Sequence, residues 1–362
     1  MTKLLIVDDS ALMRRLLGKV FTDAGFELAF ARDGVEALER VRDFKPDVIT
    51  LDVHMPQMDG LACLDRIMLE RPCPVVMVSS LTAAGADVTL EAMQLGAVDF
   101  IAKPAGAVSL AMDELGPLLV ERIRAAAKAK VRRTRRLAER VRLRAMAEPF
   151  APARSSPAVE TGPAAIPLPA IAADTIVLVG TSTGGPPALD ALLSPLPADF
   201  PWPIVVAQHM PASFTGALAR RLDKLCALTV VEVTQLMPLA AGHVYIGKGD
   251  ADVILGVRQG NIVVSPAPMS SDYPWHPSVD RLVKSALAHA GACRLVGVLM
   301  TGMGNDGATA MTQLRAEGGR TIAEAEATAV VWGMPGELVK AGGAEIVAPL
   351  DEIAEILRGW AL

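Results

Sequence analysis

Residues 176–185, IVLVGTSTGG, form an apolar, β-branched run that stops at Gly180 and continues into a serine between two glycines. Such a run predicts a buried strand, and the glycines predict a tight turn into a helix. The spacing fits G-x-S-x-G, the strand-to-helix turn that lifts a serine hydroxyl clear of the backbone. The segment therefore predicts an α/β domain with Ser182 at the edge of its sheet, and a glycine-rich turn that grips a phosphate is the competing interpretation.

A serine hydroxyl needs a general base and an orienting carboxylate before it acts as a nucleophile. Two later apolar runs lead into candidates: residues 204–208 precede His209, and residues 295–300 precede a glycine-rich turn that contains Asp306. Functional groups gather beyond the carboxyl ends of strands in open parallel sheets. A packed histidine and an ordinary turn would explain each signal alone. Three candidates at three strand ends favour a catalytic Ser182, His209 and Asp306.

The chain order of these candidates differs from the Ser, acid, His order of α/β-hydrolases, which would require another histidine as the base. The other candidates are His243, in a turn between two apparent strands, His276, at the start of a helix, and His289, in an alanine-rich helical run. None of them ends a buried parallel strand. Triads recur in different chain orders on unrelated folds, so His209 is the favoured base.

The first 120 residues alternate strand-like and helix-like segments, with apolar runs at 4–7, 48–51, 75–78 and 98–101. This alternation predicts a parallel sheet with helices on both faces. The polar residues that follow the runs are Asp8, Asp9, Asp52, Ser79 and Lys103. Three carboxylates on one rim would repel one another without a cation, and hard oxygen ligands suit Mg²⁺. A helix cap would explain Asp8 and Asp9 but not Asp52 or Lys103.

These segments resemble a response-regulator receiver domain, on the strength of Asp8-Asp9, TLDVHMP at 50–56, MDG at 58–60, VSS at 78–80 and Lys103-Pro104. The resemblance implies a flavodoxin-like domain with a five-stranded parallel sheet, in which Asp52 accepts a phosphoryl group from a histidine kinase. It also implies that Asp8, Asp9, Asp52 and the backbone carbonyl of His54 hold Mg²⁺. Ser79 and Lys103 would contact the phosphoryl group.

Residues 173–362 again alternate strands and helices and predict a doubly wound, mainly parallel sheet. Within them, residues 242–247, 252–257 and 261–264 have the pattern of short strands with tight turns. They predict a small antiparallel insertion.

The second domain resembles the catalytic domain of chemotaxis protein-glutamate methylesterases. The matching pieces are GTSTGG at 180–185, QHMP at 208–211, PSVD at 277–280, TGMGNDG at 301–307 and GMP at 333–335. The resemblance implies that Ser182 is the nucleophile, His209 the base and Asp306 its orienting carboxylate. It implies oxyanion donors in the backbone N–H groups of Thr183 and Met303.

Two departures from the family pattern lie near these residues. Thr181 stands where many members have alanine, beside the nucleophile. Glu324 and Ala325 replace a glutamine and an aspartate and add negative charge near the predicted active face.

The two domains, at 1–120 and 173–362, are joined by a connector at 121–172. Its first half, to Ala145, is rich in Arg and Lys and predicts a basic helix, and its second half is rich in Pro and Ala and predicts an extended linker. A solvated helix that leads out of the first domain explains the basic run better than nucleic-acid binding. The net charge of −5 of the whole chain also argues against general nucleic-acid binding. An acidic partner, or an acidic surface of the chain itself, is a third interpretation.

The chain has the sequence features of a cytoplasmic protein. Its four cysteines, Cys63, Cys73, Cys226 and Cys293, lack the spacing of a metal or redox motif, which indicates reduced thiols. We find neither a signal peptide nor an apolar run long enough to span a bilayer, so we expect no insertion into a membrane.

Together the two resemblances imply a phosphorylation-controlled serine esterase that acts in chemotaxis adaptation. It would hydrolyse glutamyl methyl esters on the cytoplasmic helices of chemoreceptors, release methanol, and also deamidate receptor glutamine. We expect Mg²⁺ in the receiver domain and no cofactor for the esterase reaction. One rival is a DNA-binding regulator, which predicts a helix-turn-helix in the second half. The other is a nucleotide-binding domain, which predicts a Walker lysine or an acidic ribose-binding residue after the next strand, where Gln208-His209 stands.

Overall fold

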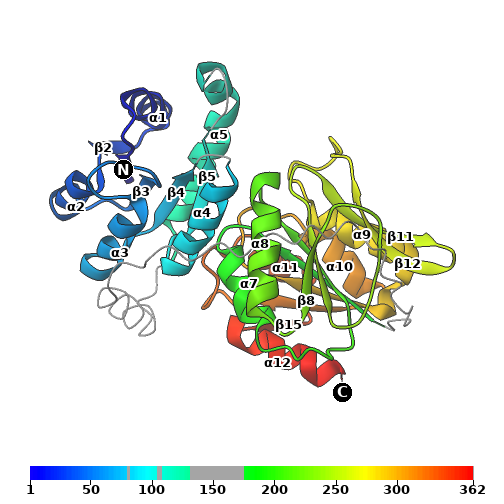
Figure 1. The fold of residues 1–362 in the computed structure, drawn as a ribbon. Coiled ribbons are helices and arrows are strands. Elements are labelled where there is room, and N and C mark those ends of the chain that lie inside the picture. The colour runs from blue at the N-terminus through cyan, green and yellow to red at the C-terminus, as the bar shows by residue number, and fades with distance from the viewer. Residues whose placement is uncertain (80–81, 104–107, 131–174, 362) are drawn as a thin grey trace.

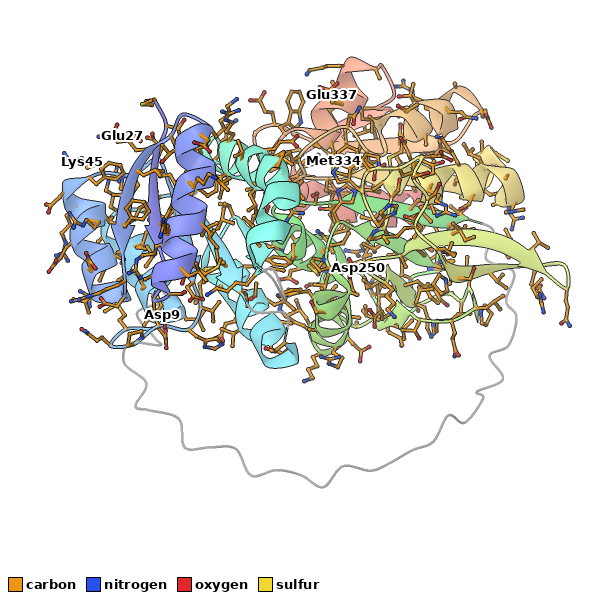
Figure 2. All side chains as sticks on the ribbon, turned by 90° about the horizontal axis from the view of Figure 1, so that it is seen from above. Asp9, Glu27, Lys45, Asp250, Met334 and Glu337 are labelled. Carbon is orange, nitrogen blue, oxygen red and sulfur yellow. The ribbon has the colours of Figure 1, made fainter. Side chains whose placement is uncertain are left out.

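A computed structural model describes residues 1–79, 82–103, 108–130 and 175–361. These residues form two α/β domains that lie side by side (Figure 1). Seen from above, Asp9 lies in the first domain and Asp250 and Met334 lie in the second (Figure 2).

The first domain is a five-stranded parallel sheet in the order β2-β1-β3-β4-β5. Its strands are β1 (Lys3–Val7), β2 (Glu27–Ala31), β3 (Val48–Asp52), β4 (Val75–Ser79) and β5 (Asp99–Ala102). Its helices are α1 (Ala11–Asp23), α2 (Gly34–Asp43), α3 (Gly60–Glu70), α4 (Ala83–Leu95) and α5 (Val108–Ala127). The flavodoxin-like fold is thereby confirmed. The apolar runs located four strands; the fifth, β2, is an edge strand whose half-exposed pattern gave no strong signal.

The second domain contains a seven-stranded sheet in the order β15-β14-β13-β6-β7-β10-β8, and all of its pairings are parallel. Its strands are β6 (Ile176–Thr181), β7 (Ile204–Gln208), β8 (Thr229–Val233), β10 (His243–Gly247), β13 (Leu295–Leu299), β14 (Arg320–Glu324) and β15 (Ile346–Ala348). Its helices are α7 (Gly185–Leu193), α8 (Ala212–Leu225), α9 (Val279–Ala290), α10 (Ala308–Ala316), α11 (Met334–Lys340) and α12 (Leu350–Ala361). Because β13, β6 and β7 are neighbours, the residues that follow them meet at one edge.

A small antiparallel sheet accompanies the parallel one, as expected. It consists of β9 (Met237–Pro238), β11 (Asp252–Arg258) and β12 (Asn261–Ala267). The prediction was wrong for residues 242–247, because β10 lies between β7 and β8 in the parallel sheet. Val244, Tyr245 and Ile246 are all buried, which fits a strand covered on both faces. This sheet-based domain also argues against a helix-turn-helix output domain.

The basic helix predicted for residues 121–145 is only partly visible. Helix α5 continues from the first domain through Glu121 and ends at Ala127. The rest of the basic run and the Pro/Ala-rich linker, at 131–174, lie outside the described residues. None of the described helices combines the length and apolar character needed to cross a membrane.

The two domains pack directly against each other. Helix α4 of the first domain contacts α8 of the second. The rings of Phe100, in β5, and Phe214, in α8, have centroids 4.4 Å apart. A single cluster of buried apolar side chains runs through both domains and includes this pair. The described conformation is therefore a closed one, with the first domain seated on the second.

Candidate active site

The turn after β6 presents Ser182 at the carboxyl edge of the sheet. The Ser182 N–H donates to the carbonyl of Thr301, which fixes the turn against the segment after β13. Gly184 has φ of +78°, a backbone conformation that residues with a side chain rarely adopt. A Cβ atom added at Gly184 would lie 2.8 Å from the side chain of Val330. Helix α7 begins at the next residue. The Ser182 side chain is partly exposed, as a nucleophile must be.

His209 and Asp306 form a buried pair beside this turn. Nε2 of His209 lies 2.8 Å from Oδ2 of Asp306, and the two residues are 7% and 3% exposed. Nδ1 of His209 is buried and has no hydrogen-bond partner among the described residues. The pair is thus arranged with Nε2 toward the carboxylate and Nδ1 directed elsewhere, whereas in the serine-protease template Nδ1 faces the carboxylate.

Four donors hold the Asp306 carboxylate in place. Besides His209, Oδ2 accepts from the Val279 N–H at 2.7 Å, while Oδ1 accepts from Ser278 Oγ and the Asp280 N–H, both at 3.0 Å. Val279 and Asp280 open helix α9, whose N-terminus favours negative charge. Burial raises the pKa of Asp306, but the hydrogen bonds and charge of His209, together with the backbone donors, lower the pKa below its ordinary value overall. Asp306 is therefore kept ionised. Sequence reasoning gave Ser278 no role.

The backbone N–H groups of Thr183 and Met303, the predicted oxyanion donors, donate to no described residue. Thr301 connects the segments that carry them. Its hydroxyl donates to the Thr183 carbonyl at 2.9 Å and accepts from the Val331 N–H at 3.0 Å. The sequence offered no signal for this bridging role, because it depends on contacts between distant turns.

Two of the alternative histidines have partners other than Asp306. His243 opens β10, and its Nδ1 contacts the Ala241 carbonyl at 2.8 Å. His276 pairs with the buried Asp252, with Nδ1 to Oδ1 at 3.1 Å. His289 lies in the last turn of α9. Of the four histidines in the second domain, His209 is the one that pairs with Asp306 beside the Ser182 turn.

Both departures from the family pattern are accommodated around Thr301. The Thr181 hydroxyl donates to the Thr301 carbonyl at 2.9 Å, and the same carbonyl accepts from the Ser182 N–H at 3.0 Å. Glu324 is fully buried at the end of β14, and its Oε2 accepts from the Thr301 N–H at 2.8 Å. The Glu324 carboxyl group thus supports the backbone of this edge of the sheet.

The first domain carries a second cluster of charged groups, at the carboxyl edge of its own sheet. Carboxylate oxygens of Asp8, Asp9 and Asp52 lie within 4.8 Å of one another. Nζ of Lys103 lies 2.7 Å from Asp52 and 3.0 Å from Asp8. Ser79 ends the neighbouring strand and is buried. Burial raises the pKa of Asp52, and Lys103 opposes this effect. Three clustered carboxylates are a donor set that fits a hard divalent cation.

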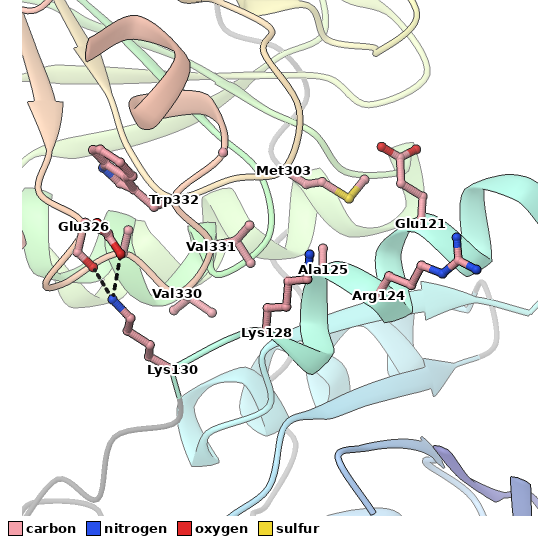
Figure 3. A pocket seen from close by; sticks show the side chains of 12 residues that line it. Glu121, Arg124, Ala125, Lys128, Lys130, Met303, Glu326, Val330, Val331 and Trp332 are labelled. Atoms are coloured by element: carbon pink, nitrogen blue, oxygen red, sulfur yellow. Dashed lines mark hydrogen bonds and ion pairs between the residues drawn. The ribbon is translucent and has the colours of Figure 1, made fainter. Parts of the chain in front are cut away.

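The first domain covers part of the esterase edge. Oγ of Thr183 donates to Oδ2 of Asp99, in β5, at 2.8 Å. Val330, which packs against Gly184, also contacts the apolar cluster that contains Ile123 of α5. A cavity of about 430 Å³ lies where the two domains meet (Figure 3). It is lined on one side by Arg124, Lys128 and Lys130, and on the other by Met303, Glu326 and Trp332.

Known proteins resemble the chain over almost its whole length. The CheB methylesterase family matches residues 177–357, and the response regulator receiver domain family matches residues 4–112. A protein-glutamate methylesterase/protein-glutamine glutaminase of Rhodopseudomonas palustris (strain BisB18) is 60% identical over 99% of this chain and 98% of its own. One of Rhodospirillum rubrum is 54% identical over 99% of this chain and 96% of its own.

Among solved structures, the CheB methylesterase catalytic domain of Thermotoga maritima is 38% identical, with a TM-score of 0.50. The match covers 51% of this chain and 98% of the Thermotoga maritima domain. The strand-end geometry and these similarities agree: the chain belongs to the CheB family of protein-glutamate methylesterases/protein-glutamine glutaminases, with a receiver domain ahead of the catalytic domain.

Proposed function

We propose that Ser182, His209 and Asp306 carry out the methylesterase reaction of this chain, under the control of phosphorylation at Asp52. The substrate is the methyl ester of a glutamyl side chain on a cytoplasmic helix of a chemoreceptor. The observation that supports this proposal most strongly is the buried His209–Asp306 pair beside the Ser182 turn, at the ends of three adjacent strands.

The reaction has two halves. Ser182 Oγ attacks the ester carbonyl while its proton passes to Nδ1 of His209. Negative charge develops on the carbonyl oxygen, where the N–H groups of Thr183 and Met303 stabilise it. His209 returns the proton to the leaving methoxide, and methanol departs. Water then attacks the acyl-enzyme by the same route, and the product is a glutamate side chain.

The same acyl chemistry removes ammonia from a glutamine side chain. A glutamine amide also presents a carbonyl to Ser182, and His209 protonates the nitrogen that leaves. The buried Glu324 does not oppose this activity, because its carboxylate is engaged with the Thr301 N–H behind the catalytic edge.

In the receiver domain, Asp52 accepts the phosphoryl group from a histidine kinase of the chemotaxis system. Asp8, Asp9, Asp52 and the backbone carbonyl of His54 would hold Mg²⁺, which would neutralise charge on the phosphoryl oxygens. Lys103, already in contact with Asp52, and the hydroxyl of Ser79 hold the phosphoryl group. The esterase reaction needs no cofactor. We place the protein in the cytoplasm, where the kinase and the receptor helices are.

A fluorophosphonate probe tests the esterase directly. We expect it to attach to the full-length chain at Ser182, because the probe reports a serine activated by a base. Peptide mass spectrometry should find the adduct on the peptide that contains residues 176–185, and Ser182→Ala should abolish it. Ser194→Ala is the matched control, since this exposed serine lies at the opposite end of α7 from the Ser182 turn. A stable adduct on another serine would contradict the assignment.

We propose that the unphosphorylated receiver domain inhibits the esterase by occlusion. Asp99 holds Thr183, the residue after the nucleophile, and Phe100 packs on Phe214. Phosphorylation at Asp52 would reposition Ser79 and Phe100 and weaken this interface. The size of the activation is limited by the difference in stability between the docked and undocked states.

Weakening the interface should therefore activate the unphosphorylated enzyme. A hydrogen bond to a charged group contributes about 1.5–3 kcal/mol, and about 1.4 kcal/mol corresponds to a tenfold change in an equilibrium. We expect Asp99→Ala to raise receptor demethylation by the full-length chain about tenfold. Asp23→Ala, which removes an exposed carboxylate at the end of α1, should leave it unchanged.

A fragment that starts near Ala170 should also be faster than the unphosphorylated chain, and it should not respond to a phosphodonor. Equal rates for the fragment, Asp99→Ala and the wild type, with and without phosphodonor, would exclude occlusion. The receiver would then act by bringing the enzyme to its receptors.

A further inference from the structure

The indole of Trp275 lies on the catalytic imidazole. The ring planes of Trp275 and His209 differ by only 2°, and their centroids are 5.7 Å apart. This is the offset parallel arrangement that aromatic pairs favour. Asp306 occupies the Nε2 edge of His209, so the imidazole is contacted on an edge by a carboxylate and on a face by an aromatic ring.

The segment that follows Trp275 is held by two buried carboxylates, Asp252 and Asp306. Asp252, fully buried in β11, accepts from the Ser278 N–H at 2.8 Å and contacts His276 at 3.1 Å. Arg281 also binds Asp252. Ser278 Oγ reaches across to Asp306. Trp275 therefore precedes a segment that is bonded to the same carboxylate as His209.

The turn that carries the proposed oxyanion donor leaves room for the indole. Gly304 follows Met303 and has φ of +84°, and an added Cβ would lie 2.9 Å from Cζ2 of Trp275. The glycine thus allows the backbone to approach the ring closely. Trp275 contacts both the base and the oxyanion turn, although it lies 66 residues from His209 in the sequence.

We propose that Trp275 is a positioning residue for the esterase reaction, which stabilises His209 in its protonated state and fixes the plane of the ring. The inference rests on His209 acting as the base for Ser182. When Nδ1 takes the serine proton, the imidazole becomes a cation, and the π face of an indole attracts a cation placed within about 6 Å of its centroid. The neutral imidazole gains less, so the contact favours the transition state over the ground state.

The test compares substitutions that keep or remove the aromatic face in the full-length chain. Trp275→Phe keeps a π face, whereas Trp275→Met fills space without one. We expect Trp275→Met to lower kcat for methyl-ester hydrolysis about tenfold, within the range that a cation–π contact supplies, with little change in KM. Trp275→Phe should recover most of this loss. The rate of fluorophosphonate labelling should fall in parallel, since it also needs His209 but no receptor docking.

Two controls separate this inference from the proposed function. Trp360 lies in the last helix, α12, where the guanidinium of Arg320 stacks on its ring. Trp360→Met should leave the rates of ester hydrolysis and of fluorophosphonate labelling unchanged. His209→Ala should abolish both. If His209→Ala reacts like the wild type, the proposed base is wrong. If His209→Ala is inactive but Trp275→Met matches the wild type, or Trp275→Phe is as slow as Trp275→Met, the role of Trp275 is overturned.

Discussion

Ser182→Ala and His209→Ala should each lower methyl-ester hydrolysis by at least about a thousandfold, because a nucleophile and its base work as one unit. The double substitution should be no slower than either single one, for the same reason. Methanol release from a methylated receptor fragment measures the loss, and thermal unfolding shows whether the domain remains folded. A folded His209→Ala protein with near-normal activity would remove His209 from the mechanism and reopen His243 and His276 as bases.

Asp306→Asn should show an equally large loss of activity together with a loss of stability. All four contacts of this carboxylate come from groups that can donate: His209, Ser278 Oγ and the N–H groups of Val279 and Asp280. An asparagine amide would direct its own N–H groups at some of these donors, and a buried unsatisfied group costs about 1–3 kcal/mol. Ser182→Ala, at a partly exposed hydroxyl that bonds to no described residue, should unfold at the wild-type temperature.

The sequence was most informative where function lies at the ends of buried parallel strands. An apolar run that ends in a polar residue identifies both a strand and the edge to which it points. Ser182, His209 and Asp306 follow β6, β7 and β13, which are neighbours in the sheet, so all three lie at one edge of it, and His209 and Asp306 are in contact. The same reasoning located Asp8, Asp52 and Lys103 in the first domain, where the structure places them in contact.

The sequence was least informative where a contact depends on the packing of distant segments. Trp275 stands in a polar stretch with no periodicity, and nothing local indicates that it stacks on His209. The hydrogen bond from Thr183 to Asp99 joins two domains and requires their relative placement. The short apolar strand β10 was assigned to the wrong sheet, because a central parallel strand and a hairpin strand of five residues look alike in sequence.

Asp52→Asn should abolish phosphorylation of the chain altogether. With Mg²⁺ and a small acyl-phosphate donor, the wild type should acquire one acid-labile phosphoryl group, since only a carboxylate can form an acyl phosphate. Asp52 lies within 2.7 Å of the ammonium group of Lys103, which is suited to neutralise the incoming charge. Burial opposes the charge on Lys103, but the hydrogen bond to Asp52 and the nearby carboxylates raise its pKa overall, so the ammonium stays protonated. An undiminished label in Asp52→Asn would show that another residue is the acceptor.

Substitutions at the two other carboxylates of the cluster distinguish metal binding from phosphoryl acceptance. Asp9 is exposed, and replacing it leaves the acceptor Asp52 in place. Asp9→Ala should therefore still accept the label. It should need about tenfold more Mg²⁺ for half-maximal labelling, because a charged ligand of the metal is lost. Asp43→Ala, at the exposed end of α2, should retain the wild-type requirement. Phosphorylation of Asp52 is expected to release Thr183 from Asp99. Esterase activity should therefore rise with labelling in Asp9→Ala and in Asp43→Ala, and it should remain at the basal rate in Asp52→Asn. Activation of Asp52→Asn by the phosphodonor would break the link between the carboxylate cluster and the catalytic edge.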